Sequence, residues 1–147
     1  MNRDDVIFTL NDLIETSKDG ERGFHACGDA VKSPDIKDFC ERKAMQCRVG
    51  AAQLQAIVHE MGGNPDESGS TAGSLRRFWV NIRSTIAGMA DHAILEECER
   101  GEDAAKKAYE QALRQELPGD VRRVVERQYQ AVRANHDRVK ELRNATV

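Results

Sequence analysis

Four long segments of this 147-residue chain carry apolar and small residues at alternating intervals of three and four positions. This spacing places those residues along one side of an α-helix, as in the seam of a coiled coil. A helix with an apolar stripe must bury that stripe against another element. The spacing therefore predicts an all-α chain, a single domain over 1–147, whose four long helices pack on one another over residues 4–32, 34–61, 91–116 and 118–144.

Proline and glycine mark the breaks between these helices. Ser33 is suited to cap a helix that begins at Pro34, and the Gly-Gly-Asn-Pro sequence after this helix is a typical helix end. A Leu-Pro-Gly turn at 117–119 separates the last two helices. Residues 62–90 are expected to form a crossover that contains a short amphipathic helix over about 74–87.

The second half of the chain resembles the first. Shifted by 81 positions, ILEECERGE lies over LIETSKDGE, so that Gly101 aligns with Gly20 and Glu102 with Glu21. The chain is therefore expected to consist of two pseudo-repeated helical hairpins. The long crossover between them implies that the second and third long helices run parallel, as in the one-crossover connectivity of ferritin-like four-helix bundles.

The aligned glycines lie inside predicted helices, where glycine costs about 1 kcal/mol relative to alanine. Gly20 and Gly101 both lie on a seam near the middle of their helices. Without a Cβ at these positions, a neighbouring backbone or a bulky side chain can come close. Trp79, the single tryptophan of the chain, is one candidate for that side chain.

The composition narrows the possible functions. Charged residues make up 32% of the chain and the formal net charge is −3, which disfavours a protein whose main role is nucleic-acid binding. The start of the chain has acidic residues where a secretory signal has basic ones, and no apolar run approaches the ~20 residues that span a bilayer. We therefore expect a cytoplasmic protein that does not enter a membrane. Its cysteines form no CxxC motif and are expected to pack as small apolar residues: Cys27, Cys40, Cys47 and Cys98.

Several stretches of the sequence together resemble a known family. They read LNDLIETSKDGERGF, GGNPDESGSTAGSLRRFW, ILEECERGEDAAKKAYEQAL and NHDRVKELR. This combination is similar to an uncharacterised bacterial family of ferritin-like four-helix-bundle proteins, a domain of unknown function. The resemblance covers essentially the whole chain and implies the fold and a bacterial origin, but no activity. Members of that family often carry Glu where this chain has Gln53.

A ferritin-like fold raises the question of a metal centre. Di-iron proteins of this kind place four carboxylates and usually two histidines at the middle of the bundle. Glu21 and Glu102 flank their seams and can face inward, and His136 is the histidine nearest the predicted centre. The second and fourth long helices contain no Glu-x-x-His motif. Only a degenerate site of Glu21, Glu102 and His136 is therefore a candidate for iron or manganese.

A polar network is the alternative, and the sequence favours it over a metal. Lys43 and Gln128 occupy matching seam positions one or two helical turns from the two glutamates. A buried carboxylate without a partner costs several kcal/mol or acquires a raised pKa. A lysine beside inward glutamates supplies a positive charge where a cation would otherwise lie, so no cofactor is expected.

The crossover helix carries three arginines beside aromatic residues, in the sequence SLRRFWVNIRS. Basic residues next to an aromatic side chain can bind nucleic acid or another anionic surface. Packing of Trp79 inward, with Arg76, Arg77 and Arg83 in water or paired with helix glutamates, explains the same pattern and is favoured.

These observations favour a helical-bundle protein with a structural, stress-related or interaction role and no catalytic constellation. Long amphipathic bundles often expose a second apolar stripe, so a homodimer or larger homo-oligomer is expected. Two alternatives remain open. The first is a metal-binding or oxidoreductase protein with a degenerate di-metal centre, and the second is a nucleic-acid or anionic-surface binder that uses the crossover helix.

Overall fold

The computed structural model describes residues 1–66 and 72–146, with the backbone alone at 72–74. This part of the chain is helical, contains no strand, and confirms the all-α prediction. Residues 67–71 of the expected crossover lie outside the described part. The helices are α1 (Arg3–Ala30), α2 (Pro34–Glu60), α3 (Ala72–Thr85), α4 (Asp91–Leu113) and α5 (Gly119–Ala145).

The ends of these helices follow from local side-chain chemistry. The side chain of Ser33 accepts a hydrogen bond from the backbone of Ile36, which caps α2 one residue before Pro34. The third long helix was expected to run to residue 116, but α4 ends at Leu113. The guanidinium of Arg122 donates to the carbonyls of Leu113 and Gln115 at 3.0 and 2.6 Å. It thus satisfies one acceptor that the last turn of α4 leaves open and one in the turn that follows.

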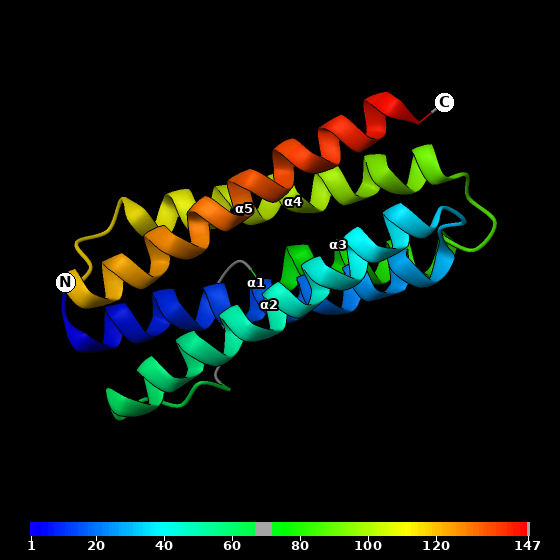
Figure 1. Cartoon of the computed structure of the whole chain (residues 1–147). Coiled ribbons are helices and arrows are strands. Elements are labelled where there is room, and N and C mark those ends of the chain that lie inside the picture. The colour runs from blue at the N-terminus through cyan, green and yellow to red at the C-terminus, as the bar shows by residue number, and fades with distance from the viewer. Residues whose placement is uncertain (67–71, 147) are drawn as a thin grey trace.

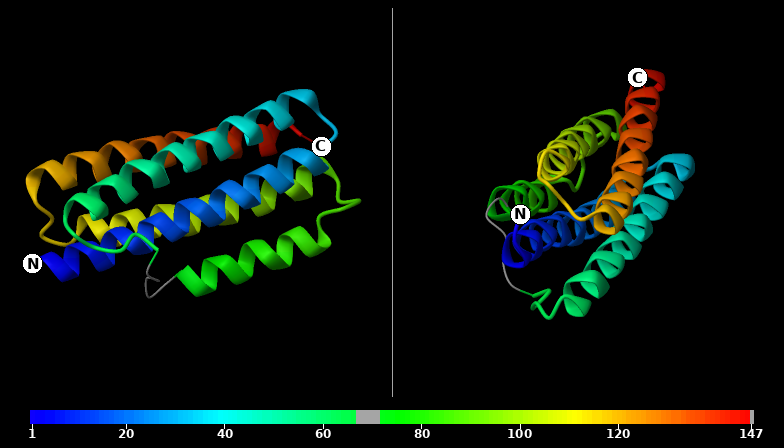
Figure 2. Two further views of the ribbon diagram at one scale, coloured as in Figure 1. Left: turned by 90° about the horizontal axis from the view of Figure 1, so that it is seen from below. Right: turned by 90° about the vertical axis from the view of Figure 1, so that its left-hand side faces the viewer.

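The long helices lie side by side and alternate in direction within each hairpin (Figure 1). Helix α1 packs against α2, and α4 packs against α5, while α1 also contacts α4 and α2 also contacts α5. The two hairpins are arranged so that α2 and α4 run in the same direction, as do α1 and α5 (Figure 1). Helix α3 lies along the outside of the molecule (Figure 2) and contacts α1 and α4.

The apolar core consists of two clusters. The first contains Phe24, Phe39, Trp79 and Leu95, and it includes side chains from all five helices. The second contains Leu10, Leu54, Tyr109 and Val125, and α1, α2, α4 and α5 contribute to it. Buried polar side chains, described below, lie between the two clusters.

Trp79 of α3 reaches in between α1 and α4. Its side chain is 2% exposed, and a Cβ added at either Gly23 or Gly101 would overlap the indole ring. The expected approach of a bulky side chain to a seam glycine is therefore found at Gly101. Gly20, its counterpart in the sequence repeat, faces Cys47 instead, whose Sγ would lie 3.1 Å from an added Cβ. The indole is also flanked by Phe24, with ring centroids 5.2 Å apart.

Replacement of Gly101 by alanine tests this packing. The new methyl group would displace a buried indole that has little space to move, so Gly101→Ala is expected to lower the free energy of unfolding by about 1–3 kcal/mol, as overpacking typically does. Urea denaturation followed by circular dichroism measures the change. The matched control is Gly119→Ala at the start of α5, where an added Cβ meets open space. An equal loss of stability in both variants would contradict the packing of Trp79 on Gly101.

Candidate functional site

A buried ion pair lies between the two apolar clusters. Lys43 on α2 is 5% exposed, Glu102 on α4 is 1% exposed, and Lys43 Nζ lies 3.2 Å from Glu102 Oε1. Neither carboxylate oxygen of Glu102 accepts a hydrogen bond of good geometry from any described residue. The nearby ammonium is therefore the main compensation for this buried charge. Lys43 Nζ also lies 5.8 Å from the ring centroid of Phe24, within the range of a cation–π contact.

Burial shapes the protonation of both partners. It raises the pKa of Glu102 above its ordinary value, and the positive charge of Lys43 opposes that rise. For Lys43, burial acts to lower the pKa, but its interactions with Glu102 and Cys47 together outweigh this effect and leave the pKa above its ordinary value. Lys43 is thus held as an ammonium ion, and this ammonium favours the ionised form of the buried Glu102.

A chain of hydrogen bonds next to this pair links all four long helices. The hydroxyl of Tyr109 on α4 donates to Oε1 of Gln128 on α5 at 2.7 Å, so the hydroxyl of Ser17 on α1, 3.4 Å away, acts as the donor to Tyr109. The amide of Gln128 then donates to the carbonyl of Gly50 on α2 at 3.1 Å and to Gln53 at 2.9 Å. We refer to Ser17, Lys43, Glu102, Tyr109 and Gln128 as the polar layer.

A small cavity opens beside the polar layer. It measures about 70 Å³, and all five side chains of the polar layer line it. Sites for organic cofactors and drug-sized ligands are usually about 300–1,000 Å³. The cavity therefore has room for a few water molecules but not for a cofactor.

The thiol of Cys47 also lines this cavity and is not activated. Burial raises its pKa to about 11, although the nearby Lys43 ammonium acts in the opposite direction. A thiol with this pKa is protonated at neutral pH and is a weak nucleophile. The other cysteines are completely buried in the first apolar cluster, as expected for small apolar residues: Cys27, Cys40 and Cys98.

The residues of the predicted metal site lie in different surroundings. Glu102 belongs to the polar layer, whereas Glu21 is partly exposed on α1. His136 Nε2 lies 2.6 Å from Asp103 Oδ1. In residues 1–66 and 72–146, only one group of three or more His, Cys, Asp or Glu side chains has ligand atoms within 4.8 Å of one another, and it contains none of these residues. The metal site of Glu21, Glu102 and His136 stays a prediction.

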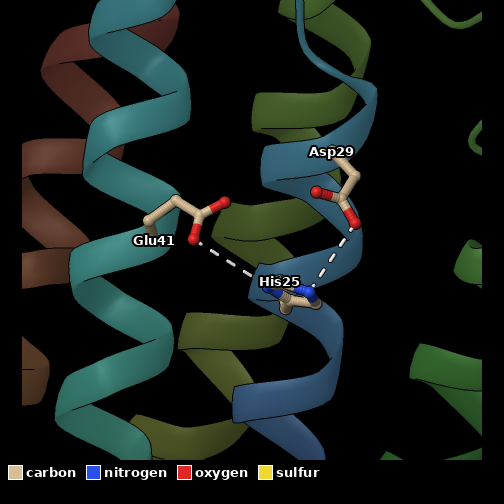
Figure 3. Close-up of side chains that lie close together, drawn as sticks. All are labelled: His25, Asp29 and Glu41. Carbon is tan, nitrogen blue, oxygen red and sulfur yellow. Dashed lines mark ion pairs between the residues drawn. The ribbon is translucent and has the colours of Figure 1, made fainter.

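The group with that spacing is an exposed cluster that connects α1 and α2 (Figure 3). His25 Nε2 lies 3.7 Å from Asp29 Oδ2, and His25 Nδ1 lies 3.9 Å from Glu41 Oε2. The two carboxylates thus face different nitrogens of one imidazole ring. Lys37 Nζ lies 3.9 Å from the other oxygen of Asp29, so a cation already accompanies this carboxylate. The arrangement is that of a surface charge cluster.

Arg76 of the crossover helix faces two carboxylates of α1. Arg76 Nη2 lies 3.5 Å from Glu15 Oε2, and Arg76 Nε lies 3.7 Å from Asp19 Oδ1. Asp19 is buried, and burial raises its pKa while Arg76 and Arg22 act to lower it. Arg76 therefore serves α1 as a counter-charge, which reduces the positive charge that this helix presents to an outside anion.

A comparison with known protein families matches residues 5–115 to a family described as "Domain of unknown function (DUF2383)". The chain belongs to the DUF2383 family. The match spans α1 to α4 and thus includes the Lys43–Glu102 pair, Tyr109 and Trp79. No curated protein matches the chain. Among the described residues of this DUF2383 protein, no helix is both long and apolar enough to cross a membrane.

The sequence pointed to Lys43, Glu102 and Gln128 but did not point to Tyr109 or Ser17 as polar partners. Tyr109 lies seven positions after Glu102, on the same side of α4, and the seam positions next to it are Ala105, Ala108 and Ala112. A tyrosine among small residues on a helix seam is the sequence feature that could have indicated a buried polar side chain. The partners of Tyr109 depend on how far each helix is shifted along its axis relative to its neighbours, and the sequence does not specify that shift.

A double-mutant cycle tests the buried pair. Lys43→Met leaves the Glu102 carboxylate buried without its counter-charge, so we expect the free energy of unfolding to fall by about 3–5 kcal/mol. The double variant Lys43→Met/Glu102→Leu removes both charges and is expected to recover most of that loss. Chemical denaturation of the wild type, Lys43→Met, Glu102→Leu and the double variant measures the coupling. The exposed Arg138–Glu141 pair, with Nη1 and Oε2 3.1 Å apart, provides the control, because Arg138→Met is expected to cost at most about 1 kcal/mol. Additive effects at Lys43 and Glu102 would contradict the pairing.

The raised pKa of Cys47 predicts slow labelling of this thiol. A pKa of about 11 instead of the ordinary 9.0 leaves about 100-fold less thiolate at pH 7.5. Alkylation of folded Cys47 by iodoacetamide, followed by mass spectrometry, should be slower by at least that factor than in urea, and should accelerate up to pH 11. Since the folded state binds this proton more tightly, the contribution of Cys47 to stability is complete below pH 9 and declines as the pH rises through 11. The Cys47→Ser variant identifies the labelled peptide. Equal rates in folded and unfolded protein at pH 7.5 would refute this prediction.

Proposed function

We propose that this DUF2383 protein is a four-helix bundle with ferritin-like connectivity that has no catalytic role and acts through contacts of its surface, in a structural or stress-related capacity. The observation that carries the proposal is the Lys43–Glu102 pair, in which a side-chain ammonium lies 3.2 Å from a carboxylate in the middle of the protein. Bacterial origin and cytoplasmic location belong to the same proposal and rest on the sequence alone.

The directions of the helices support the ferritin-like part of this proposal. Helices α2 and α4 run in the same direction and are joined by a long connection that contains α3 (Figure 1). One long crossover between two helical hairpins is the connectivity of ferritin-like folds. The hydrogen bonds from Ser17 through Tyr109 and Gln128 to Gly50 connect all four long helices in the interior of the protein.

The chemistry of the polar layer supports the absence of a catalytic role. A catalytic nucleophile or base needs a pKa close to the working pH and access to a substrate. Burial raises the pKa of both the Cys47 thiol and the Tyr109 hydroxyl, so both stay protonated at neutral pH. The cavity of about 70 Å³ beside them is far smaller than sites for cofactors and drug-sized ligands, which measure about 300–1,000 Å³.

Metal binding is the second candidate function, because one observation favours it. A protonated His136 would act to lower the pKa of Glu102, so these two residues of the predicted Glu21, Glu102 and His136 site are within electrostatic reach of each other. Iron or manganese at this site would require Lys43 to move, since two positive charges next to one carboxylate repel each other. We therefore rank metal binding below the surface role.

Metal analysis tests both candidates directly. Protein expressed with iron and manganese available is expected to contain much less than one metal ion per chain and to show no Fe(II) oxidation above the buffer rate. Stoichiometric metal that is lost in both Glu21→Gln and Glu102→Gln would overturn the proposal and establish the metal site. Glu41→Gln is the matched control, because metal lost in this variant alone would come from the exposed His25 cluster.

A further inference from the structure

The outer side of α2 carries an apolar surface that no other part of the described chain covers. Met45 is 55% exposed and Val49 is 49% exposed, and they lie one helical turn apart. Ala52 and Ala56 continue the same side of the helix and are also exposed. Within the described residues, α2 contacts only α1 and α5, and it lies at the edge of the molecule (right view of Figure 2).

The spacing of these residues is that of a second helical seam. Intervals of three and four residues connect Arg42, Met45, Val49, Ala52, Ala56 and His59, which we call the outer seam. This seam lies opposite the buried positions of the same helix, such as Leu54 and Val58. Four successive exposed positions of this series are apolar, namely Met45, Val49, Ala52 and Ala56, as in a helix face that packs on a partner helix.

We infer that the outer seam joins two copies of this chain, with their α2 helices antiparallel and related by a two-fold axis. The pattern is self-complementary about a point between Gly50 and Ala51. In an antiparallel pair centred there, Met45 faces the partner's Ala56, and Val49 faces the partner's Ala52. Each large side chain thus meets a small one, which lets the two helices approach closely without leaving a gap.

The charges at the two ends of the seam select this partner and this direction. Arg42 lies at one end and Glu60 at the other, both exposed and at nearly equal distances from the centre. Arg42 also forms an exposed ion pair with Asp38 of its own helix, with Nε and Oδ2 3.1 Å apart, and such surface pairs exchange at little cost. Antiparallel pairing about this centre places Arg42 opposite the partner's His59 and beside the partner's Glu60, at both ends of a contact that spans about 27 Å of helix. Parallel pairing would place each Arg42 next to the partner's Arg42, and like charges in contact are unfavourable.

This inference rests on the proposed surface role, for which it names a second copy of the chain as the partner. Failure of the two ideas is distinguishable. A monomer in solution would refute the dimer and leave the metal analysis unaffected. Stoichiometric metal that is lost in the Glu102→Gln variant would refute the non-catalytic proposal and leave the dimer unaffected.

Sedimentation equilibrium tests the dimer on the full chain. We expect the wild type to approach twice the chain mass of 16.4 kDa with increasing concentration. Ala52→Lys places a charge at the centre of the seam and is expected to weaken the dimer at least about tenfold. Ala134→Lys adds the same side chain at an exposed position of α5 and should leave dimerisation unchanged. Circular dichroism verifies that both variants are folded.

Charge reversal tests the antiparallel arrangement. Arg42→Glu alone and Glu60→Arg alone should each weaken the dimer several-fold, whereas the double variant Arg42→Glu/Glu60→Arg should restore it, because each reversed residue again meets its opposite on the partner. The restoration should diminish at high salt. A wild type that stays monomeric, a dimer that tolerates Ala52→Lys, or a double variant that is no better than the singles would each overturn the inference.

Discussion

The transfer of one ammonium and one carboxylate from water to the interior costs several kcal/mol per ion, and their mutual attraction offsets this only at close range. The Lys43–Glu102 pair meets that condition at a distance of 3.2 Å. The pair therefore contributes little net stability, but it restricts the position of α2 relative to α4, because any shift of one helix along the other would separate the two charges. The hydrogen bonds of Tyr109 and Gln128 add the same constraint for α1 and α5. The ion pair and these hydrogen bonds together fix how the four helices are aligned along their axes, because apolar seams alone would allow one helix to shift along another.

The crossover helix completes this arrangement from one side. Trp79 fills the space that Gly23 and Gly101 leave open, and its ring also lines the cavity next to the polar layer. The two glycines lower the helix propensity of α1 and α4, but their lack of a Cβ allows α3 to approach both helices closely. Arg76 holds the same helix through the carboxylates of α1. The buried indole therefore covers one side of the polar layer, where burial raises the pKa of Glu102.

Much of the helix pattern could be predicted from the sequence, because seam spacing, Ser33-Pro34 and the glycine-rich turns act locally. The candidate site was predictable in part. Lys43 could be singled out because a lysine on an apolar seam requires a counter-charge, and Glu102 lies where one could be supplied. The role of Tyr109 and the contact of Trp79 with Gly23 could not be predicted, since both depend on how far each helix is rotated and shifted against its neighbours. The outer seam of α2 was likewise hidden by the stronger inner seam.

The most direct test of this account is an NMR measurement of the Lys43 side chain with ¹⁵N-labelled lysine. The account predicts a Lys43 ammonium signal at neutral pH whose protons exchange slowly with water, because the group is buried and paired, and it predicts that this signal is lost or strongly shifted in Glu102→Gln. A neutral Lys43 amine, or an ammonium signal that Glu102→Gln leaves unchanged, would contradict the claim that this ion pair organises the centre of the protein.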